Sequence, residues 1–373
     1  MKKITYITQR KTNLVSNFAN SSQVVNTSNA IGKLYNNFEV FFLRYKIQSS
    51  HNFLLEVKEK YSVINFKIKS IHNYKFFKND LSYGLFVSFK FLMNDNIFYT
   101  RQDWVAFFLT LINKKVFFEA HDYDRNRLCL KFMSRLCSNR KNLTIITISE
   151  QLKKEFIEMK FKNRIHVSHD GVDVEFYKPS NTIKMREKLN IDLNKKIALY
   201  SGALREGRGV SKILDIAKIK PEIDFFIFGG RDTKRLSFLK QKSKHLPNIS
   251  FFGFVKKDIL VQYMNAADIF LMPHQKNCDI IKFTSPLKMF EYLAIGKPII
   301  ASNFSVFREV LVDKENSLLA EHDSEDDFSK RIDFVLNDKN TYKILSNNAL
   351  KSSKKYSWEN RAKNILKIIN EKN

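Results

Sequence analysis

Short apolar runs recur along the first half of the chain, separated by longer amphipathic stretches. The runs are ITYIT at 4–8, FEVFFLRY at 38–45, NIFYT at 96–100, KVFFEAH at 115–121 and TIITIS at 144–149. Their length and their content of β-branched and aromatic residues predict buried strands, and the apolar period of the segment at 103–112 predicts a helix. Strands that alternate with helices indicate a parallel, doubly wound α/β sheet.

The same pattern starts again after KPSN at 178–181, which we interpret as a linker. The predicted strands of this second series are KIALYSGAL at 196–204, which ends in a glycine turn, DFFIFGG at 224–230, ISFFGFV at 249–255, DIFLMP at 268–273 and PIIAS at 298–302. A chain of 373 residues is too long for one ordinary core, so two domains are expected, at 1–178 and 179–354. The segment 355–373 predicts an amphipathic helix with an apolar stripe.

The segment 285–302, SPLKMFEYLAIGKPIIAS, carries the strongest local signals. Ser285 is suited to cap a helix, Pro286 to begin it, and Gly296 to end it. A helix start of this kind attracts phosphate, because its first amide groups have no partner within the helix. Lys288 in the first turn is unfavourable there unless a bound anion offsets its charge. The alternative is an ordinary capped helix of an α/β protein.

This segment resembles the donor-sugar motif of retaining glycosyltransferases of family 4, which have the GT-B fold. The resemblance implies two Rossmann-like domains that face a central cleft, with the terminal helix packing back across both. It implies a nucleoside-diphosphate sugar as donor and an acceptor hydroxyl, with attack on the front face of the sugar and no enzyme nucleophile. Ser285, Pro286 and Leu287 would hold the diphosphate with Lys288, and Glu291 would bind the ribose hydroxyls.

Other segments extend the resemblance. The loop SGALREGRG at 201–209 matches a phosphate-binding turn of the family, which implies that Gly202 and Arg208 contact the diphosphate. The family's first cation of this loop is replaced by Ala203, and Arg205 is the residue that would substitute for it. Phe254 and Val255 match the place where the family holds the nucleotide base. His121, after a first-domain strand, matches a histidine that contacts the donor sugar.

Three residues depart from the family pattern. Besides Ala203, Phe283 stands where many relatives have an acid near the transferred sugar, and Asp170 replaces an asparagine. These changes keep open a protein of this fold that binds a sugar nucleotide without transferring it. Donor base, sugar, acceptor and linkage are not encoded in any motif of the sequence.

Charge adds a further candidate partner. The chain has a net charge of +26, and residues 1–180 contribute 29 Lys and Arg against 15 Asp and Glu. Such an excess favours polyanions, including anionic lipid and nucleic acid, although AT-rich coding also enriches lysine. The sequence has no zinc motif, RNA-binding strand signature or basic helix, so specific nucleic-acid binding remains the weaker alternative.

The remaining composition bears on location and cofactors. Cys129, Cys137 and Cys278 lack metal-ligand spacing and are expected to be free thiols in a reducing compartment. The first ten residues lack the apolar core of a signal peptide, and no apolar run is long enough to span a bilayer. We therefore expect a cytoplasmic protein, peripheral on the membrane, that needs neither metal nor cofactor and builds surface polysaccharide, lipopolysaccharide or lipid-linked glycan with its sugar donor.

Overall fold

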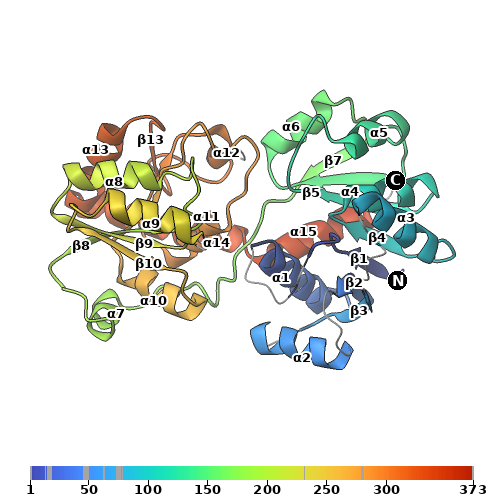
Figure 1. Cartoon of the computed structure of the whole chain (residues 1–373), viewed down its shortest axis with the longest axis horizontal. Coiled ribbons are helices and arrows are strands. Elements are labelled where there is room, and N and C mark those ends of the chain that lie inside the picture. Colours follow the sequence, from blue (N-terminus) through green and yellow to red (C-terminus); the bar gives the residue numbers. More distant parts are fainter. Residues whose placement is uncertain are drawn as a thin grey trace. The chain divides into compact units, whose positions relative to one another are not determined.

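The computed structural model of the chain describes residues 2–12, 14, 19–44, 50–61, 64–72, 77, 79–230, 232–278 and 281–371. It divides into two compact units (Figure 1). The first unit comprises Met1–Asp170 and Trp358–Asn373, and the second comprises Gly171–Ser357. The chain therefore passes from the first unit to the second and returns to the first for its last helix.

The first unit is built on a seven-stranded sheet in the order β3-β2-β1-β4-β5-β6-β7, and its strand pairs are parallel. The strands are β1 (Ile4–Ile7), β2 (Phe38–Arg44), β3 (Lys67–His72), β4 (Ile97–Thr100), β5 (Lys115–Ala120), β6 (Leu143–Thr147) and β7 (Arg164–Val167). The helices are α1 (Ala19–Leu34), α2 (Ser50–Tyr61), α3 (Asp80–Lys90), α4 (Asp103–Leu111), α5 (Leu128–Leu136), α6 (Glu150–Glu158) and α15 (Trp358–Asn370).

The second unit has a six-stranded parallel sheet in the order β10-β9-β8-β11-β12-β13. Its strands are β8 (Lys196–Ser201), β9 (Ile223–Phe228), β10 (Ile249–Gly253), β11 (Ile269–Met272), β12 (Ile299–Ser302) and β13 (Leu318–Ala320). Its helices are α7 (Thr182–Lys188), α8 (Val210–Ile219), α9 (Thr233–Lys242), α10 (Lys257–Ala266), α11 (Leu287–Ile295), α12 (Ser305–Arg308), α13 (Glu325–Asn337) and α14 (Lys339–Lys355).

Both faces of the second sheet are buried. Along β8, Ile197 and Leu199 belong to one apolar cluster, whereas Ala198 and Tyr200 belong to another. Successive strand residues point to opposite faces, so each cluster covers one face. Continuous burial on both faces explains why these strands read as uninterrupted apolar runs in the sequence.

The first crossover lies earlier than the predicted linker. Residues 178–181 are fastened within the second unit, because Asn265 accepts a hydrogen bond from the Ser180 amide (2.6 Å) and donates one to the Lys178 carbonyl (3.2 Å). Asn181 caps α7 by accepting from the Lys184 amide. Polar composition suggested a free linker here, but these side chains satisfy the backbone of a packed segment.

The terminal helix α15 lies in the first unit, where it packs on α1. Its buried positions include Trp358, Ala362, Ile365 and Ile369, the apolar stripe that the sequence predicts. Just before it, the Val172 amide donates a hydrogen bond to the Tyr356 carbonyl (2.9 Å). The two segments that connect the units are therefore bonded to each other within the second unit. No described helix combines the length and the apolar character needed to cross a bilayer.

Candidate functional site

The carboxyl ends of β8 and β11 form the first candidate site. In the second sheet the chain leaves β8 toward β9 on one side and returns to β11 on the other, so the strand order reverses between β8 and β11. Ligands of doubly wound sheets bind outside the carboxyl ends of strands at such a reversal. The loop after β8 contains Gly202 and Arg208, and the segment after β11 leads into α11.

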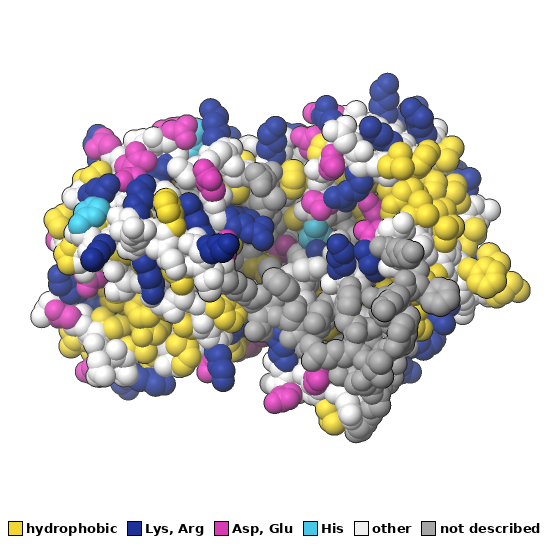
Figure 2. Space-filling view, viewed as in Figure 1, with side chains coloured by type: hydrophobic (Ala, Val, Ile, Leu, Met, Phe, Trp, Pro, Cys, Tyr) yellow, Lys and Arg dark blue, Asp and Glu magenta, His cyan; other side chains and the backbone are white. Residues whose placement is uncertain are grey.

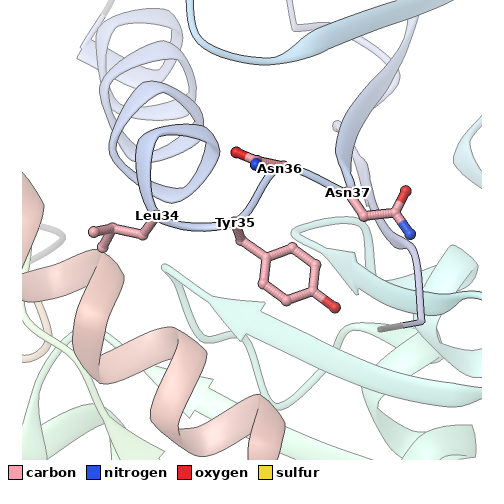
Figure 3. A pocket seen from close by; sticks show the side chains of 4 residues that line it. All are labelled: Leu34, Tyr35, Asn36 and Asn37. Atoms are coloured by element: carbon pink, nitrogen blue, oxygen red, sulfur yellow. The ribbon is translucent and has the colours of Figure 1, made fainter.

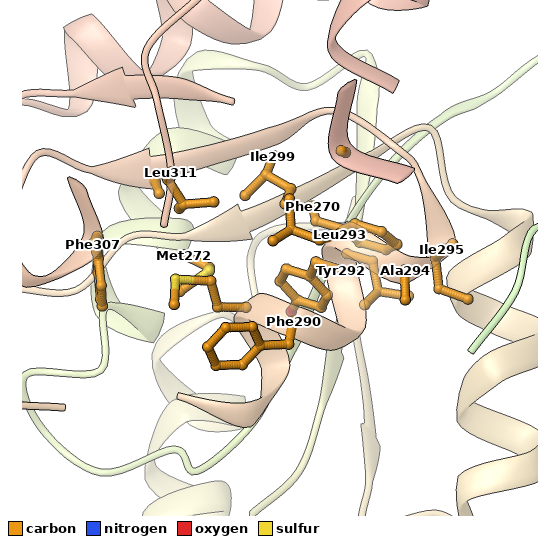
Figure 4. Packing of buried hydrophobic residues seen from close by; sticks show 14 of the residues in the cluster. Phe270, Met272, Phe290, Tyr292, Leu293, Ala294, Ile295, Ile299, Phe307 and Leu311 are labelled. Carbon is orange, nitrogen blue, oxygen red and sulfur yellow. The ribbon is translucent and has the colours of Figure 1, made fainter. Parts of the chain in front are cut away.

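The core fixes α11 against the end of β8. Tyr292 of α11 stacks on Phe270 of β11, with ring centres 4.3 Å apart (Figure 4). Its hydroxyl also accepts a hydrogen bond from the Ser201 amide (2.7 Å), at the last residue of β8. Lys288 lies four residues before Tyr292, on the same side of the helix. Packing of the apolar face therefore delivers Lys288 to the end of β8.

Lys288 is buried, and its Nζ has no hydrogen-bond partner within the described part of the chain. The ammonium lies 3.9 Å from the centre of the Tyr200 ring, a cation–π contact. Burial, and next the charge of Arg208, hold the pKa of Lys288 well below its ordinary value. A buried cation with a second cation nearby and no hydrogen-bond acceptor is an incomplete site that an anion would complete.

Glycines bring the backbone close to this lysine. Gly202 has a φ of +145°, and a Cβ there would lie 3.4 Å from Lys288 Nζ and 3.3 Å from the Tyr200 hydroxyl. Gly209 has a φ of +88°, and its Cβ would lie 1.8 Å from the Pro273 carbonyl oxygen. Only glycine fits at Gly209, so the loop after β8 is held against the end of β11.

The start of α11 differs by one residue from the sequence prediction. The helix begins at Leu287, and its N-cap is Pro286, whose ψ of 125° is extended; no side chain caps it. Ser285 precedes the cap and is buried. The extended proline moves the helix start by one residue, so Ser285 lies before the cap position that it was expected to fill.

Glu291 lies one turn after Lys288 and is partly buried. Burial raises the pKa of its carboxyl group, while Lys257, a hydrogen bond from Tyr177 and Lys288 act in the opposite direction. The carboxylate is thus a partly desolvated acceptor held by a tyrosine donor, and it can accept further hydrogen bonds from hydroxyl groups.

The other predicted residues of this unit are placed differently. Arg205 is an exposed loop residue, whereas Arg208 is partly buried and close enough to depress the pKa of Lys288 and of His274. Phe254 is 53% exposed after β10, and Val255 packs on the apolar cluster that contains α11. The structure therefore gathers Gly202, Arg208, Lys288 and Glu291 around the start of α11 and leaves Arg205 in solvent.

His274 was not anticipated. It follows β11, is fully buried, and neither ring nitrogen has a hydrogen-bond partner among the residues that the structure describes. Burial, then Lys288 and Arg208, hold its pKa well below the ordinary value, so the ring is neutral. A histidine directly after a predicted strand of a doubly wound sheet is the signal that marked His121 and that also applied to this residue.

The second candidate site surrounds His121 in the first unit. His121 follows β5, and its Nε2 bonds to Glu119 while its Nδ1 lies 3.3 Å from Gln23 Nε2. Arg361 of α15 lies 3.2 Å from Glu119 and 3.7 Å from Asp170. Burial and next Arg101 lower the pKa of His121, although Glu119 and Asp170 raise it.

A shallow pocket in the same unit is lined by Leu34, Tyr35, Asn36 and Asn37 (Figure 3). It lies between the end of α1 and the start of β2, at the amino edge of the sheet rather than the carboxyl edge. The Tyr35 hydroxyl donates a hydrogen bond to the Lys2 carbonyl (2.6 Å), so its polar group is already satisfied. This pocket is not a candidate site.

Comparison with known proteins finds similarity to glycosyltransferases. Residues 181–352 match the family Glycosyl transferases group 1. An uncharacterized glycosyltransferase of Methanocaldococcus jannaschii is 26% identical over 61% of this chain and 59% of its own length. The processive diacylglycerol alpha-glucosyltransferase of Acholeplasma laidlawii is 24% identical over 51% of this chain and 58% of its own length. The chain thus spans about three fifths of the length of these relatives.

Solved structures extend the similarity to both units. Sucrose-phosphate synthase from Thermosynechococcus elongatus superposes with a TM-score of 0.77, covering 99% of this chain and 98% of its own at 14% identity. HepE from Anabaena, solved with UDP and glucose, gives 0.73 over 99% of both chains at 17% identity. The predicted GT-B fold is confirmed, and within it residues 181–352 match the Glycosyl transferases group 1 family.

Proposed function

We propose that the chain is a retaining, metal-independent glycosyltransferase of family 4 that moves a sugar from a nucleoside-diphosphate sugar to an acceptor hydroxyl. The observation that carries this proposal is the buried Lys288 ammonium, which has no hydrogen-bond partner among the described residues and stands in the first turn of α11. A diphosphate supplies the missing negative charge and accepts from the first-turn amides. Neither an ordinary structural lysine nor an ordinary capped helix has this combination.

The same cations serve the chemical step. When the bond between the anomeric carbon and the diphosphate oxygen breaks, its electron pair stays on that oxygen. The acceptor hydroxyl oxygen forms the new bond on the same face, and its proton passes to the departing diphosphate. Lys288 and Arg208 then face more negative charge than in the bound donor, so they stabilise the transition state more than the ground state. Glu291 orients the donor through the ribose hydroxyls.

The structure of HepE contains UDP, which supports a nucleoside diphosphate as the ligand of this site. Phe254 and Val255 follow β10, next to the glycine turn at its end, and offer apolar and backbone contacts to a base. Such contacts do not distinguish uracil from guanine or adenine. The donor base is therefore a matter for measurement.

The test is a calorimetric screen of UDP, GDP and ADP in EDTA, followed by each corresponding sugar donor. We expect one nucleotide to bind in EDTA, and its sugar donor to yield the free nucleoside diphosphate on addition of acceptor lipid. Binding that needs Mg²⁺ contradicts the metal-free assignment. Binding without transfer or donor hydrolysis indicates a sugar-nucleotide binder, and binding only to nucleic acid, lost at moderate salt, indicates the basic-protein alternative.

The first unit exposes apolar and basic side chains on two helices, as expected for a protein whose acceptor lies in a membrane. Helices α3 and α5 expose apolar side chains at helical spacing, and Figure 2 shows hydrophobic side chains gathered in this region. They are Leu81, Leu85 and Phe89 of α3, Leu92 and Met93 beyond it, and Leu128, Phe132 and Leu136 of α5. Lys90, Lys131 and Arg135 are exposed on the same helices, and the acid Asp80 is paired with Arg10. We assign this surface to an anionic bilayer.

Vesicle sedimentation tests the assignment. Phe89 is 80% exposed, and inserting a side chain of this size contributes about 1.5–3 kcal/mol. Phe89→Glu should therefore weaken binding to anionic vesicles at least tenfold, whereas Phe334→Glu, at a 48% exposed phenylalanine of the second unit, should not. Equal binding to neutral vesicles, or equal effects of the two variants, contradicts the assignment.

A further inference from the structure

Two buried arginines and two buried carboxylates surround His121 in the first unit. Arg101 follows β4, Glu119 is the second-last residue of β5, Asp170 follows β7 and Arg361 lies on α15. All four are at least nine-tenths buried. Positive and negative charges are equal in number, as expected for buried ions that persist without a ligand.

The amide of Gln23 on α1 has one possible orientation in this cluster. Arg101 Nη1 donates to Gln23 Oε1 (2.9 Å), and arginine can only donate. Gln23 Nε2 therefore faces Asp170, whose carboxylate accepts from it. An inverted amide would set two donors against each other at Arg101 and two acceptors at Asp170.

This orientation decides the tautomer of His121. Gln23 Nε2 lies 3.3 Å from His121 Nδ1, so Nδ1 must accept and carries no proton. His121 Nε2 bonds to Glu119, and a carboxylate accepts, so Nε2 carries the proton. The ring is neutral, in agreement with the lowering of its pKa by burial and by Arg101.

Arg361 forms ion pairs with Glu119 and Asp170, the two carboxylates on which the tautomer of His121 depends. It lies 3.2 Å from Glu119 Oε1 and 3.7 Å from Asp170 Oδ1, the two atoms that accept from His121 and from Gln23. Without its charge a buried carboxylate would gain a proton and become a donor. A protonated Glu119 would donate to Nε2 and reverse the tautomer.

We infer that Arg361 of the terminal helix, together with Asp170 and Gln23, is a positioning residue that keeps His121 neutral with its proton on Nε2 and its Nδ1 as a hydrogen-bond acceptor. For the proposed sugar transfer, on which this consequence rests, His121 then presents an acceptor to a sugar hydroxyl that displaces the Gln23 amide. It does not act as a general acid or base. Asp170, a departure from the family pattern, is explained as a charge partner of Arg361.

Long-range ¹H–¹⁵N NMR of the full chain at neutral pH identifies the tautomer without substrate. We expect His121 to show a protonated Nε2 and an unprotonated Nδ1. Arg361→Met should abolish this single tautomer, and Arg361→Lys should restore part of it. Lys363→Met removes the same charge from an exposed site on the same helix and should leave the spectrum unchanged. If Arg361→Met does not fold, Glu119→Gln tests the same network, because an amide can donate to or accept from Nε2, and the single tautomer should be lost.

Kinetics separate positioning from folding. A misplaced group costs on the order of 10²-fold in rate, so folded Arg361→Met should lower kcat by about that factor with little change in KM. An unchanged tautomer in folded Arg361→Met, or in Glu119→Gln where Arg361→Met does not fold, overturns the inference, as does a wild-type Nδ1–H tautomer or imidazolium. If the tautomer behaves as expected but no donor is ever turned over, the proposed function fails and the assignment of Arg361 stands.

Discussion

The two candidate sites of this chain differ in whether their buried cations have carboxylate partners. Around His121, Arg101 and Arg361 are matched by two carboxylates in the same cluster. At the start of α11, Lys288 is buried with Arg208 nearby, and no described residue accepts a hydrogen bond from its Nζ. Both sites lie at carboxyl edges of parallel sheets, so topology alone does not distinguish them.

The difference indicates what each site does. In the first cluster the buried charges balance without a ligand, although the Arg361 nitrogens and Glu119 Oε2 have no hydrogen-bond partner among the described residues. An unmatched cation is costly until an anion arrives, and it gives the anion a preorganised partner. The first site therefore positions a side chain, and the second binds and stabilises negative charge. Each prediction below tests one side of this contrast.

The largest effect is expected from breaking the matched cluster. Glu119→Leu removes a carboxylate that neutralises Arg361, and loss of one partner from a buried pair costs about 3–5 kcal/mol of unfolding free energy. Urea denaturation of the first unit's transition measures this loss. Glu158→Leu, at an exposed glutamate of α6, is the matched control and should cost far less. Similar stabilities would mean that the cluster is not a matched buried pair.

The next effect is on turnover. Arg208→Ala should reduce kcat by about 10²–10³, or roughly 2.7–4 kcal/mol, because a fixed cation is lost where charge grows on the diphosphate. Arg205→Ala is the control three residues away, and its exposed side chain should matter little. Steady-state rates with saturating donor decide between them. A dominant effect of Arg205 would assign the cation role to the exposed loop instead.

Much of the fold was predictable, because buried parallel strands are unbroken apolar runs. β4, β5, β6, β9, β11 and β12 were located within a residue or two. β3 was missed because its sequence, KIKSIH, alternates lysine with apolar residues at a sheet edge. β13 has three residues, too few for any periodicity. The polar composition of residues 178–181 also led us to predict the domain boundary at 178, because a polar segment that is packed against its domain has the same composition as a linker.

The site of the second unit was predictable in part, because Lys288, Glu291 and Gly202 stand at fixed spacing from a helix start and a strand end. His274 was open to the same reasoning. The network of the first unit was not, because Gln23, Arg101, Asp170 and Arg361 are far apart in sequence and meet only after the sheet and α15 assemble. No local pattern specifies which arginine neutralises which carboxylate.

A smaller effect is expected on donor affinity. Glu291→Ala removes a carboxylate that accepts ribose hydroxyls, and loss of such a charged hydrogen bond costs about 1.5–3 kcal/mol. Calorimetry should therefore show nucleotide binding weakened by about 10- to 150-fold in a folded protein. Tyr177→Phe removes only the tyrosine donor to Glu291 and should cost about 0.5–1.5 kcal/mol. Unchanged affinity in Glu291→Ala removes the residue from the site, and loss of folding assigns it a structural role.

The smallest effect has the opposite sign. Lys288→Met removes an unsatisfied buried donor, which costs about 1–3 kcal/mol, and loses a cation–π contact of about 0.5–2 kcal/mol, so the ligand-free chain should gain about 1 kcal/mol. The folded pKa of Lys288 lies below its ordinary 10.5, so between these values the unfolded chain binds the extra proton. Wild-type stability should therefore rise with pH across that window, and Lys288→Met should lose this rise.

A bound diphosphate restores the charge of Lys288, so nucleotide binding by the wild-type protein in the same pH window should take up a proton. Calorimetry in buffers of different ionisation enthalpy measures this uptake. A destabilised Lys288→Met that still binds nucleotide with proton uptake would make Lys288 a structural residue and remove the contrast between the two sites.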